Sequence, residues 1–510
     1  MPALRVLIVQ VDDPATDTMT ELAAFDLPTP DPAALVPATA LDDLESSTLT
    51  TGMAVCRRLL QARCDLLDAA LAARYRQHAT APVQADGYEP LTLLSRFGRV
   101  PLRRRQLYHP ATNTHAVPGN SVLRVQAGAL TTRGLQEWAC LLPQELPFAA
   151  VERLLGWQAQ EADVLSSGTV RTLVKRHGQL VRQVEQAEAA ALLERAAPGV
   201  PAPVLVAHDR PRRRAGWPGE LNAAVEAALA ADQVRPPGGV SWADWERVLA
   251  ARRAEAAIPL EDLRHLGPRL AEGEVLLTVD EVPTPKADGT GRWELRTATL
   301  VTPDGYRYLS GTGAAFLPVV LALTLAAVGP DRVLLLISDG ARWVRTFFAE
   351  RLAHLPQATH LLDWFHLEQK CRDLGSRICR GPEAKRVFLR RLYRRLWVGQ
   401  VDEAVAWLER YRPQAKNPAV LEELIGYLRT RSEWIPNYRQ RRRDQQDIGS
   451  GRVEKANDLI VARRQKRKGM GWSLDTSDSL AALRTLLLNG GWDGYWVQGK
   501  VLPLVEPAAA

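Results

Sequence analysis

The sequence predicts an α/β fold in its second half, with an all-helical insertion and a mainly helical N-terminal region before it. Short runs of Val, Ile and Leu that are typical of buried strands alternate with helical periodicity over residues 273–365. Amphipathic helical patterns alone occupy residues 366–447, and a further helix is predicted within 448–470. We therefore expect one core formed by 273–365 and 448–470, split by a helical insertion over 366–447.

Length and composition narrow the class of protein. The chain has 510 residues, of which 46% are hydrophobic, and this length and hydrophobic content are enough for several domains. Its formal charge is +7. Its five cysteines form no CxxC pair, so neither a zinc ribbon nor a disulfide framework is indicated. No apolar run is long enough to span a membrane, and the N-terminus does not resemble a secretion signal. We expect a cytoplasmic protein.

The N-terminal half is predicted to hold four segments. Residues 1–45 are rich in Asp, Pro, Ala and Thr and are expected to form a loosely ordered arm. Residues 46–125 combine a helix over 53–75 with a small β element, because short apolar runs there are separated by Gly and Pro. Helical patterns over 132–142, 147–157 and 166–182 follow, within 126–197. Residues 198–272 are a Pro- and Arg-rich linker with further helices over 223–231 and 242–257.

The three helices within 126–197 resemble a helix-turn-helix DNA-binding region. Ser166 or Ser167 is the expected N-cap of the last helix. Arg171, Lys175 and Arg176 lie on its polar face, where they are expected to contact DNA. Three helices that pack as a plain connector are an equally good interpretation.

The order of elements in the core is informative. Strands are predicted over 274–281, 292–301 and 306–310, with a turn at 302–305. A helix over 314–327, a strand over 332–338, a helix over 342–352 and a strand over 359–362 follow. This β-β-β-α-β-α-β succession is the order of a ribonuclease-H-like fold. Helices over 385–397, 401–411 and 419–430 belong to the insertion, and 471–510 forms a C-terminal helix and tail.

Three acidic residues stand at positions that favour metal chemistry. Asp280 ends the apolar run 275–279, Asp339 ends the run 333–337, and Glu454 lies at a helix start. In a ribonuclease-H-like fold, acids on the first and fourth strands and on the last helix meet at one rim. Taken singly, each has an ordinary interpretation: the two aspartates as turn residues and Glu454 as a first-turn acid that complements the helix dipole.

A basic band surrounds Glu454. Residues 439–468 contain eight arginines and three lysines against four acidic residues, a net charge of +7. Clustered cations favour a phosphate backbone, because their binding releases counterions. The side chains expected to contact DNA are Arg452, Lys455, Arg463, Arg464, Lys466, Arg467 and Lys468. A solvated helix face is the alternative interpretation.

With these motifs in view, the chain resembles bacterial insertion-sequence transposases of the DDE type, particularly the ISKra-four group. The matching motifs span about 274–496 and are SDGARWV (338–344), LDWFH (362–366), GSGRVE (449–454), GMGW (469–472), ALR (482–484) and NGGWD (489–493). Asp363 and His366 within the second motif resemble the acid-or-Cys-x-x-His signature of related transposases. For these two residues we favour positioning of the helical insertion over metal binding.

The resemblance implies a chemistry and a set of partners. Asp280, Asp339 and Glu454 are expected to hold two Mg²⁺ ions, for which Mn²⁺ is able to substitute, with Asp280 bridging both. The implied reaction is cleavage at the ends of the element followed by strand transfer into target DNA. The implied partners are double-stranded DNA and further copies of the chain, as a homodimer or larger homo-oligomer, at the bacterial nucleoid.

Two other functions are compatible with the same sequence. A structure-selective DNA nuclease would keep the fold and stop at hydrolysis. A domesticated DNA-binding regulator would keep the DNA-binding surfaces without the reaction. The presence of all three acids favours an enzyme.

Overall fold

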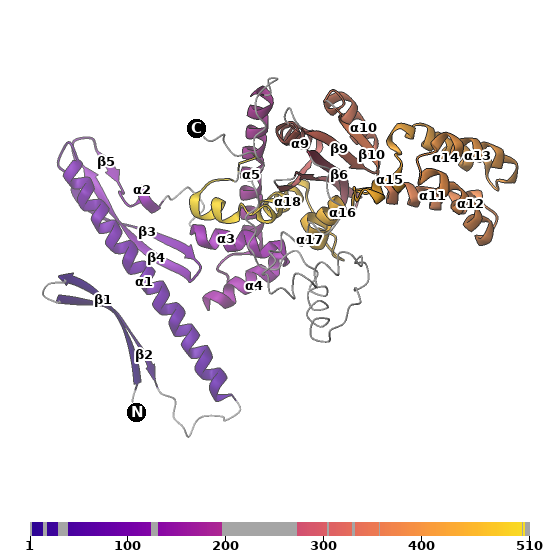
Figure 1. Cartoon of the computed structure of the whole chain (residues 1–510). Helices are drawn as coiled ribbons and strands as arrows, with labels where there is room; N and C mark the ends of the chain where they lie inside the picture. Colours follow the sequence, from indigo (N-terminus) through magenta and orange to yellow (C-terminus); the bar gives the residue numbers. More distant parts are fainter. Residues whose placement is uncertain are drawn as a thin grey trace, which may run out of the picture. The chain divides into compact units, whose positions relative to one another are not determined.

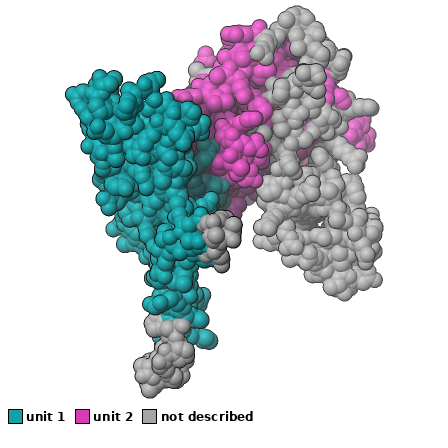
Figure 2. All heavy atoms as spheres, turned by 90° about the vertical axis from the view of Figure 1, so that its left-hand side faces the viewer, with its two compact units in different colours: residues 1–176 teal, residues 177–510 magenta. Residues whose placement is uncertain are grey.

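The structure is a computed structural model that describes residues 3–13, 18–28, 39–123, 131–195, 273–302, 305–328, 332–355, 357–501 and 503–504. The chain divides into two compact units, Met1–Arg176 and His177–Ala510 (Figure 2). The predicted linker and helices over 198–272 lie outside the described residues, as does part of the predicted turn at 302–305. No helix within the described ranges combines the length and apolar character that crossing a membrane requires.

The first unit contains two small antiparallel sheets and several helices (Figure 1). Its elements are β1 (Ala3–Asp13), β2 (Thr18–Pro28), α1 (Ala40–His78), β3 (Gln84–Ser95), β4 (Gly98–His109), β5 (Thr114–Ala116), α2 (Asn120–Leu123), α3 (Arg133–Leu141), η1 (Leu142–Gln144), α4 (Phe148–Ala159) and the first part of α5 (Ser167–Arg195). The long helix α1 packs on β4, where Leu91, Val100 and Leu102 form a small core. The helix and small β element expected over 46–125 are therefore present.

The described part of residues 1–45 differs from the loosely ordered arm that the sequence predicts. Strands β1 and β2 pair as an antiparallel hairpin, with Arg5 of β1 bonded to Asp26 of β2, and α1 already begins at Ala40. The run Val6–Val11 has β-branched residues that favour an extended backbone. Composition alone concealed this pattern, because most of its apolar side chains are exposed.

The second unit is built around a five-stranded mixed sheet. Its strands are β6 (Glu274–Pro285), β7 (Arg292–Val301), β8 (Tyr306–Thr312), β9 (Val333–Ser338) and β10 (Thr359–Leu362). They lie in the order β10-β9-β6-β7-β8. The first three form an antiparallel meander, whereas β9 pairs parallel to β6 and β10 parallel to β9. All five strands and their order along the chain agree with the sequence prediction.

Alternate side chains of the central strands are buried in two hydrophobic cores, one on each face of the sheet. Val275, Leu277 and Val279 of β6 face α9 (Gly313–Val328) and α10 (Arg342–Phe347), which continues as the π-helix η2 (Phe348–Leu352). Leu276 of β6 faces the opposite side, with Leu335 and Ile337 of β9, toward the inserted helices. Because side chains alternate along a strand, a near-continuous apolar run is what a strand buried on both faces requires.

The insertion is a compact helical block. It comprises α11 (Trp364–Ile378), α12 (Pro382–Leu396), α13 (Val401–Tyr411), η3 (Arg412–Gln414), α14 (Pro418–Arg429), η4 (Ser432–Trp434) and α15 (Tyr438–Arg443). Its core includes Phe388, Leu392, Leu421 and Leu424, and is continuous with the sheet through Leu361 and Leu362 of β10. The aromatic side chain of Trp364 packs on Trp397 and Tyr438 and so forms part of this core.

The chain returns to the sheet in its last part. The elements are α16 (Gly451–Asn457), the π-helix η5 (Asp458–Ala462), α17 (Arg463–Gln465), α18 (Leu474–Leu488) and η6 (Gly494–Gln498). Helix α16 packs on β6 and β7, and α18 packs on β8. The side chain of Asn489 accepts a bond from the backbone N–H of Tyr308 and donates one to its carbonyl, at 3.0 and 2.9 Å. It therefore satisfies backbone groups at the edge of β8, where no further strand pairs among the residues that the structure describes.

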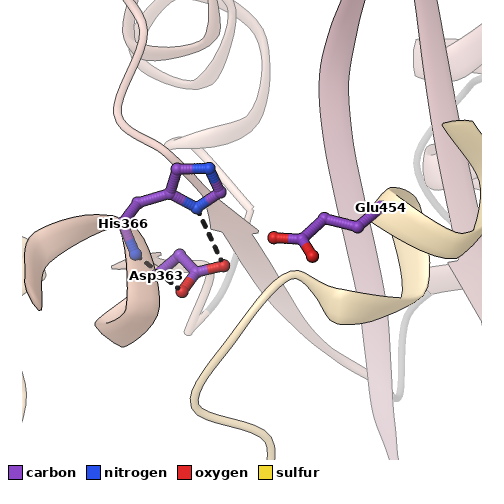
Figure 3. Close-up of side chains that lie close together, drawn as sticks. All are labelled: Asp363, His366 and Glu454. Carbon is purple, nitrogen blue, oxygen red and sulfur yellow. Dashed lines mark hydrogen bonds and ion pairs between the residues drawn. The ribbon is translucent and has the colours of Figure 1, made fainter. Parts of the chain in front are cut away.

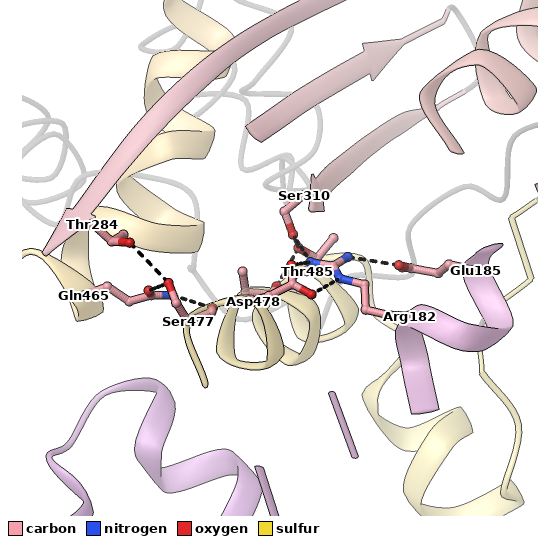
Figure 4. Close-up of polar contacts among 9 residues, drawn as sticks. Arg182, Glu185, Thr284, Ser310, Gln465, Ser477, Asp478 and Thr485 are labelled. Carbon is pink, nitrogen blue, oxygen red and sulfur yellow. Dashed lines mark hydrogen bonds and ion pairs between the residues drawn. The ribbon is translucent and has the colours of Figure 1, made fainter. Parts of the chain in front are cut away.

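A buried polar network ties α5 to α18 and the sheet (Figure 4). The Arg182 guanidinium donates to Glu185 at 3.0 Å, to Ser310 of β8 at 2.9 Å and to Asp478 of α18 at 3.3 Å. Ser310 in turn bonds Thr485 at 2.7 Å. Burying the arginine is tolerated because acidic partners and a hydroxyl group compensate for its lost hydration.

Candidate catalytic site

Two aspartates lie side by side on adjacent parallel strands: Asp280 lies within β6, and Asp339 directly follows the end of β9. Thr278 of β6 pairs with Ile337 of β9. Two residues further along each strand are Asp280 and Asp339, which therefore project from the same face of the sheet. Burial raises the pKa of the Asp280 carboxyl, and the nearby Asp339 carboxylate raises it further. The structure thus brings together the first two acids of the predicted trio.

Helix α16 holds the first of these carboxylates. The side-chain amide of Asn457 donates to Oδ2 of Asp280 at 2.5 Å, and its carbonyl oxygen accepts a bond from the Thr297 hydroxyl on β7. Oδ1 of Asp280 accepts from the backbone N–H of Glu281 at 2.8 Å. The hydrogen bonds from Glu281 and Asn457 lower the pKa of Asp280 and so oppose the effect of burial.

Glu454 lies one helical turn before Asn457 and approaches a different pair of residues (Figure 3). One carboxylate oxygen of Glu454, one of Asp363 and one ring nitrogen of His366 all lie within 4.8 Å of one another. Within the described part of the chain, Asp280 and Asp339 are not members of such a group with Glu454. The third predicted acid therefore lies on the helix that contacts Asp280, but its carboxylate is turned toward Asp363 and His366.

Asp363 ties the start of α11 to the start of α16. Its Oδ1 accepts from the backbone N–H groups of Phe365 and His366 at 2.6 and 3.3 Å, as the N-cap of α11. Its Oδ2 accepts from the backbone N–H of Ser450 at 2.6 Å and from the Ser450 hydroxyl. The side chain is fully buried. Burial works to raise its pKa, but His366 and Ser450 outweigh that effect and lower it.

His366 lies among the carboxylates as a cation. Its Nδ1 lies 3.2 Å from Oδ2 of Asp363 as an ion pair. Contact with Asp363 raises the pKa of His366 to about 9 against the effect of burial, and Asp339 and Asp280 raise it further. The imidazole is therefore protonated at neutral pH and has no lone pair free for a metal ion. This geometry supports the positioning role that the sequence favoured for Asp363 and His366.

The acid pair and the histidine cluster differ in how well they fit a divalent cation. Mg²⁺ prefers carboxylate oxygens, and the neighbouring side chains of Asp280 and Asp339 provide them. Oδ1 of Asp339 accepts from Ala341 at 2.8 Å, and no hydrogen bond to its Oδ2 is present among the described residues. Asp280 and Asp363 each accept hydrogen bonds at both oxygens, so this feature does not distinguish the two sites. The difference is the cationic His366 beside Asp363, which makes Asp280 and Asp339 the better fit for a metal ion.

Glu281, the residue after Asp280, belongs to the other face of the sheet. It pairs with Arg296 at 3.1 Å and lines a pocket of about 860 Å³ with side chains of α9 and α10. Trp343 lines the same pocket, and the Arg296 guanidinium lies over its ring at 4.4 Å. The pocket is separated from the acid pair by the sheet, because consecutive side chains of a strand point to opposite faces.

The basic residues expected to contact DNA near Glu454 have different environments. Arg463, Lys466, Arg467 and Lys468 are exposed, and Lys455 is exposed beside Asp458 at 3.1 Å. Arg452 is partly buried and lies 3.4 Å from Asp447. Partial burial and Arg292 lower the pKa of Lys466, whereas Asp280 acts in the opposite direction, so this ammonium group is near the acid pair.

Arg464 is a correction to the predicted set. Its side chain is only 5% exposed, and its guanidinium lies 4.7 Å from the ring centroid of Trp472. One of its nitrogens also contacts the Met470 sulfur at 3.7 Å. The short helix α17 directs Arg464 inward, so it stabilises the turn before α18 and does not lie on a DNA-contacting surface.

The helix-turn-helix-like segment begins its last helix as predicted. The Ser166 hydroxyl accepts from the backbone N–H of Thr169 at 3.2 Å, which identifies Ser166 as the cap of α5. Arg171 and Arg176 are exposed and Lys175 is partly buried. The Arg171 guanidinium lies 5.5 Å from the centre of the Phe148 ring.

Sequence reasoning missed Asn457 and Ser450. Asn457 stands three residues after Glu454, and residues three apart share a helix face, so this spacing was a usable signal. Ser450 lies inside the motif GSGRVE, but its bond to Asp363 joins positions far apart along the chain and left no local pattern. No family model matches the chain, and no curated protein matches it.

Proposed function

We propose that the chain is a DNA transposase with a ribonuclease-H-like catalytic core that cuts and joins DNA with the help of divalent metal ions. One observation carries the proposal: Asp280 within β6 lies beside Asp339, which directly follows the parallel strand β9, and α16 bonds Asp280 through Asn457. An isolated turn aspartate does not need such a partner. Two adjacent carboxylates, with Asp339 raising the pKa of Asp280, are suited to a divalent cation.

The sheet supports the same proposal. Three antiparallel strands are followed by two that lie parallel to the first on its other side, in the order β10-β9-β6-β7-β8. This is the arrangement expected of a ribonuclease-H-like core, and helix α16 then carries the third acid. Fold alone does not establish an activity, so the acid pair remains the stronger support.

Each residue has a role that follows from its contacts. Bound Mg²⁺ ions would supply an activated oxygen nucleophile and stabilise the leaving oxygen, and Asp280, Asp339 and Glu454 would hold them. Asn457 orients the Asp280 carboxylate. Among the described residues no hydrogen bond or ion pair holds the Glu454 carboxylate, so rotation about its side-chain bonds can turn it toward the aspartates. His366 contributes a positive charge beside the acids.

Double-stranded DNA is the proposed substrate, both as the element's ends and as the target. Exposed Arg463, Lys466, Arg467 and Lys468 follow α16 and provide phosphate contacts that position DNA without reading its sequence. Arg171, Lys175 and Arg176 of α5 are proposed as a second DNA-contacting group. Synapsis of two ends implies a homodimer or larger homo-oligomer, acting at the nucleoid in the cytoplasm.

The proposal is tested by cleavage of duplex oligonucleotides that carry the inverted repeats flanking the gene. Asp280→Ala, Asp339→Ala and Glu454→Ala should each abolish Mg²⁺-dependent cleavage and leave DNA binding largely intact. Asp402→Ala, which removes an exposed acid from α13, is the matched control and should cleave normally. An active Asp339→Ala protein refutes the assignment.

A second assay separates the proposed transposase from a structure-selective nuclease of the same fold. Pre-cleaved ends with free 3′-hydroxyls are incubated with a target plasmid and Mg²⁺. Joined products support a transposase, whereas cleavage without joining supports a nuclease. A protein that binds DNA and neither cleaves nor joins it supports the regulator alternative.

A further inference from the structure

Helix α12 of the insertion carries an excess of positive charge that the next helix, α13, does not share. Its sequence PEAKRVFLRRLYRRL contains one lysine and five arginines against the single acid Glu383. Helix α13, in contrast, contains Asp402, Glu403 and Glu409 against one arginine, Arg410. Helix α15 is also basic, with the sequence YRQRRR, so the positive charge is concentrated on α12 and α15 and is not spread over the whole block.

The packing of α12 fixes which side of the helix faces outward. Phe388, Leu392 and Leu396 are buried in the core of the insertion. Arg390, Arg391 and Arg394 are exposed on the other side. Residues three and four apart lie together on a helix surface, so these three guanidinium groups form one patch.

This patch has no acidic partners within the described part of the chain. Arg390, Arg391 and Arg394 have no side-chain hydrogen bond or ion pair there. Several exposed arginines elsewhere in the insertion are paired with acids: Arg372 with Glu368, Arg412 with Glu422 and Arg429 with Glu409, each at 2.5 Å. Like charges one turn apart repel each other in a helix. The α12 patch retains that repulsion, which a bound polyanion would relieve.

The positive surface continues onto α15. The backbone N–H of Arg439 donates to the carbonyl oxygen of Trp397, just after α12, at 3.0 Å. The rings of Trp397 and Tyr438 stack at a centroid distance of 6.1 Å. The C-terminal end of α12 is thereby joined to the start of α15, whose Arg439 and Arg443 are also exposed. Helix α15 in turn precedes α16 along the chain, and α16 bonds Asp280 through Asn457.

We propose that the exposed arginines of α12, continued by those of α15, form a DNA-contacting surface of the helical insertion, separate from the basic residues around Glu454. This inference rests on the proposed function, which supplies duplex DNA as the polyanion. Arginine forms paired hydrogen bonds with phosphate oxygens, and every cation of the patch is an arginine. A protein-binding surface would be expected to present aromatic anchors, whereas Val387 is the apolar side chain exposed beside the patch.

The experiment compares charge removal at the patch with equal charge removal at paired arginines. Arg390→Gln, Arg391→Gln and Arg394→Gln are combined in the full chain, and the control combines Arg372→Gln, Arg412→Gln and Arg429→Gln. Binding to a non-specific duplex is measured by fluorescence anisotropy over a salt series. Each lost phosphate contact lowers the slope of log affinity against log salt by about 0.9, so the patch variant should lose about 2 to 3 in slope. The control should keep the slope of the wild-type protein.

Two further arms keep the result unambiguous. A variant with lysine at all three patch positions keeps the charge and should keep the slope; loss of slope there would attribute the effect to a disturbed helix and overturn the proposal. Poly-glutamate replaces DNA in a parallel titration, and a stronger dependence of its binding on the three arginines would assign the patch to an acidic protein instead. Wild-type binding with an unchanged slope in the patch variant refutes this surface alone. Failure of the wild-type chain to bind DNA refutes the proposed function as well.

Discussion

The side-chain amide of Asn457 donates a 2.5 Å hydrogen bond to Oδ2 of Asp280. The orientation of that amide is fixed, because its carbonyl oxygen accepts a bond from the Thr297 hydroxyl. Helix α16 therefore does two things at the acid pair: it carries Glu454, and it sets the direction of the first aspartate. A shift of α16 along the sheet would change both at once.

Asn457→Ala is expected to impair cleavage without abolishing it. Loss of a residue that orients a metal-binding carboxylate typically costs about 10- to 100-fold in activity or metal affinity. Rates measured over a Mg²⁺ series should show half-saturation at a higher concentration than in the wild-type protein. Thr297→Val removes only the other bond of the amide and should have the smaller effect. Unchanged rate and Mg²⁺ dependence in Asn457→Ala would show that the bond has no positioning role.

Much of the core could be predicted because its signals are local. The strands over 292–301 and 359–362 have the predicted bounds, since apolar runs end there at turn-forming or polar residues. Asp280 and Asp339 were expected to meet because each ends a buried apolar run, although β6 continues past Asp280 to Pro285. Their adjacency needs only the pairing of two neighbouring parallel strands, which a sequence with this order of elements already favours.

The remaining features depend on contacts between distant positions. The bond from Ser450 to Asp363 joins two loops, and no spacing predicts it. Arg464 has the composition of a surface residue, yet it lies inward because Trp472 offers its ring face after the turn. The hairpin of β1 and β2 was hidden by a composition typical of loops. In each case the decisive partner is remote in sequence or the segment has no core of its own.

His366 is expected to make the folded protein less stable as the pH rises above neutral. Its pKa is about 9 in the folded chain and about 6.5 when unfolded. A raised folded pKa means that its contribution is full below pH 6.5 and is lost as the pH rises through about 9. The difference corresponds to at most roughly 3 kcal/mol, and screening at a side chain that is 38% exposed reduces it to about 1–2 kcal/mol.

Denaturant unfolding of the wild-type protein and His366→Gln, both in chelator, measures this effect. The stability difference between them should be largest near pH 6 and should shrink toward pH 9.5. His354→Gln removes an exposed histidine and serves as the control, with no such trend. A difference that stays constant over the whole range would contradict a charged His366 in the folded protein.

His360 is expected to make the folded protein less stable as the pH falls below neutral. It is buried on β10 and its Nε2 lies 2.9 Å from the Ser338 hydroxyl. Burial, assisted by Arg345, lowers its pKa to about 4. A histidine kept neutral by folding contributes stability above pH 6.5 that is lost as the pH falls toward 4, on the order of 3 kcal/mol. Glutamine at this position cannot gain a proton, so His360→Gln should flatten the acid limb of the stability curve; an equally steep limb would exclude His360 as its source.

Gly178 of α5 allows a close approach to α18. A Cβ atom at this position would lie 2.5 Å from both Cα and Cβ of Ser479 and 2.6 Å from its carbonyl oxygen. Because two of these atoms belong to the backbone, Gly178→Ala should force the helices apart and destabilise the second unit by about 1–3 kcal/mol or more. Adding Ser479→Gly should restore little, since it removes only the side-chain atom.

Gly426→Ala on α14, where no atom lies within 4 Å, is the matched control and should be neutral or stabilising by up to about 1 kcal/mol. Thermal unfolding of the four proteins decides the matter, and a Gly178→Ala protein as stable as the wild type would show that α5 and α18 do not pack this closely.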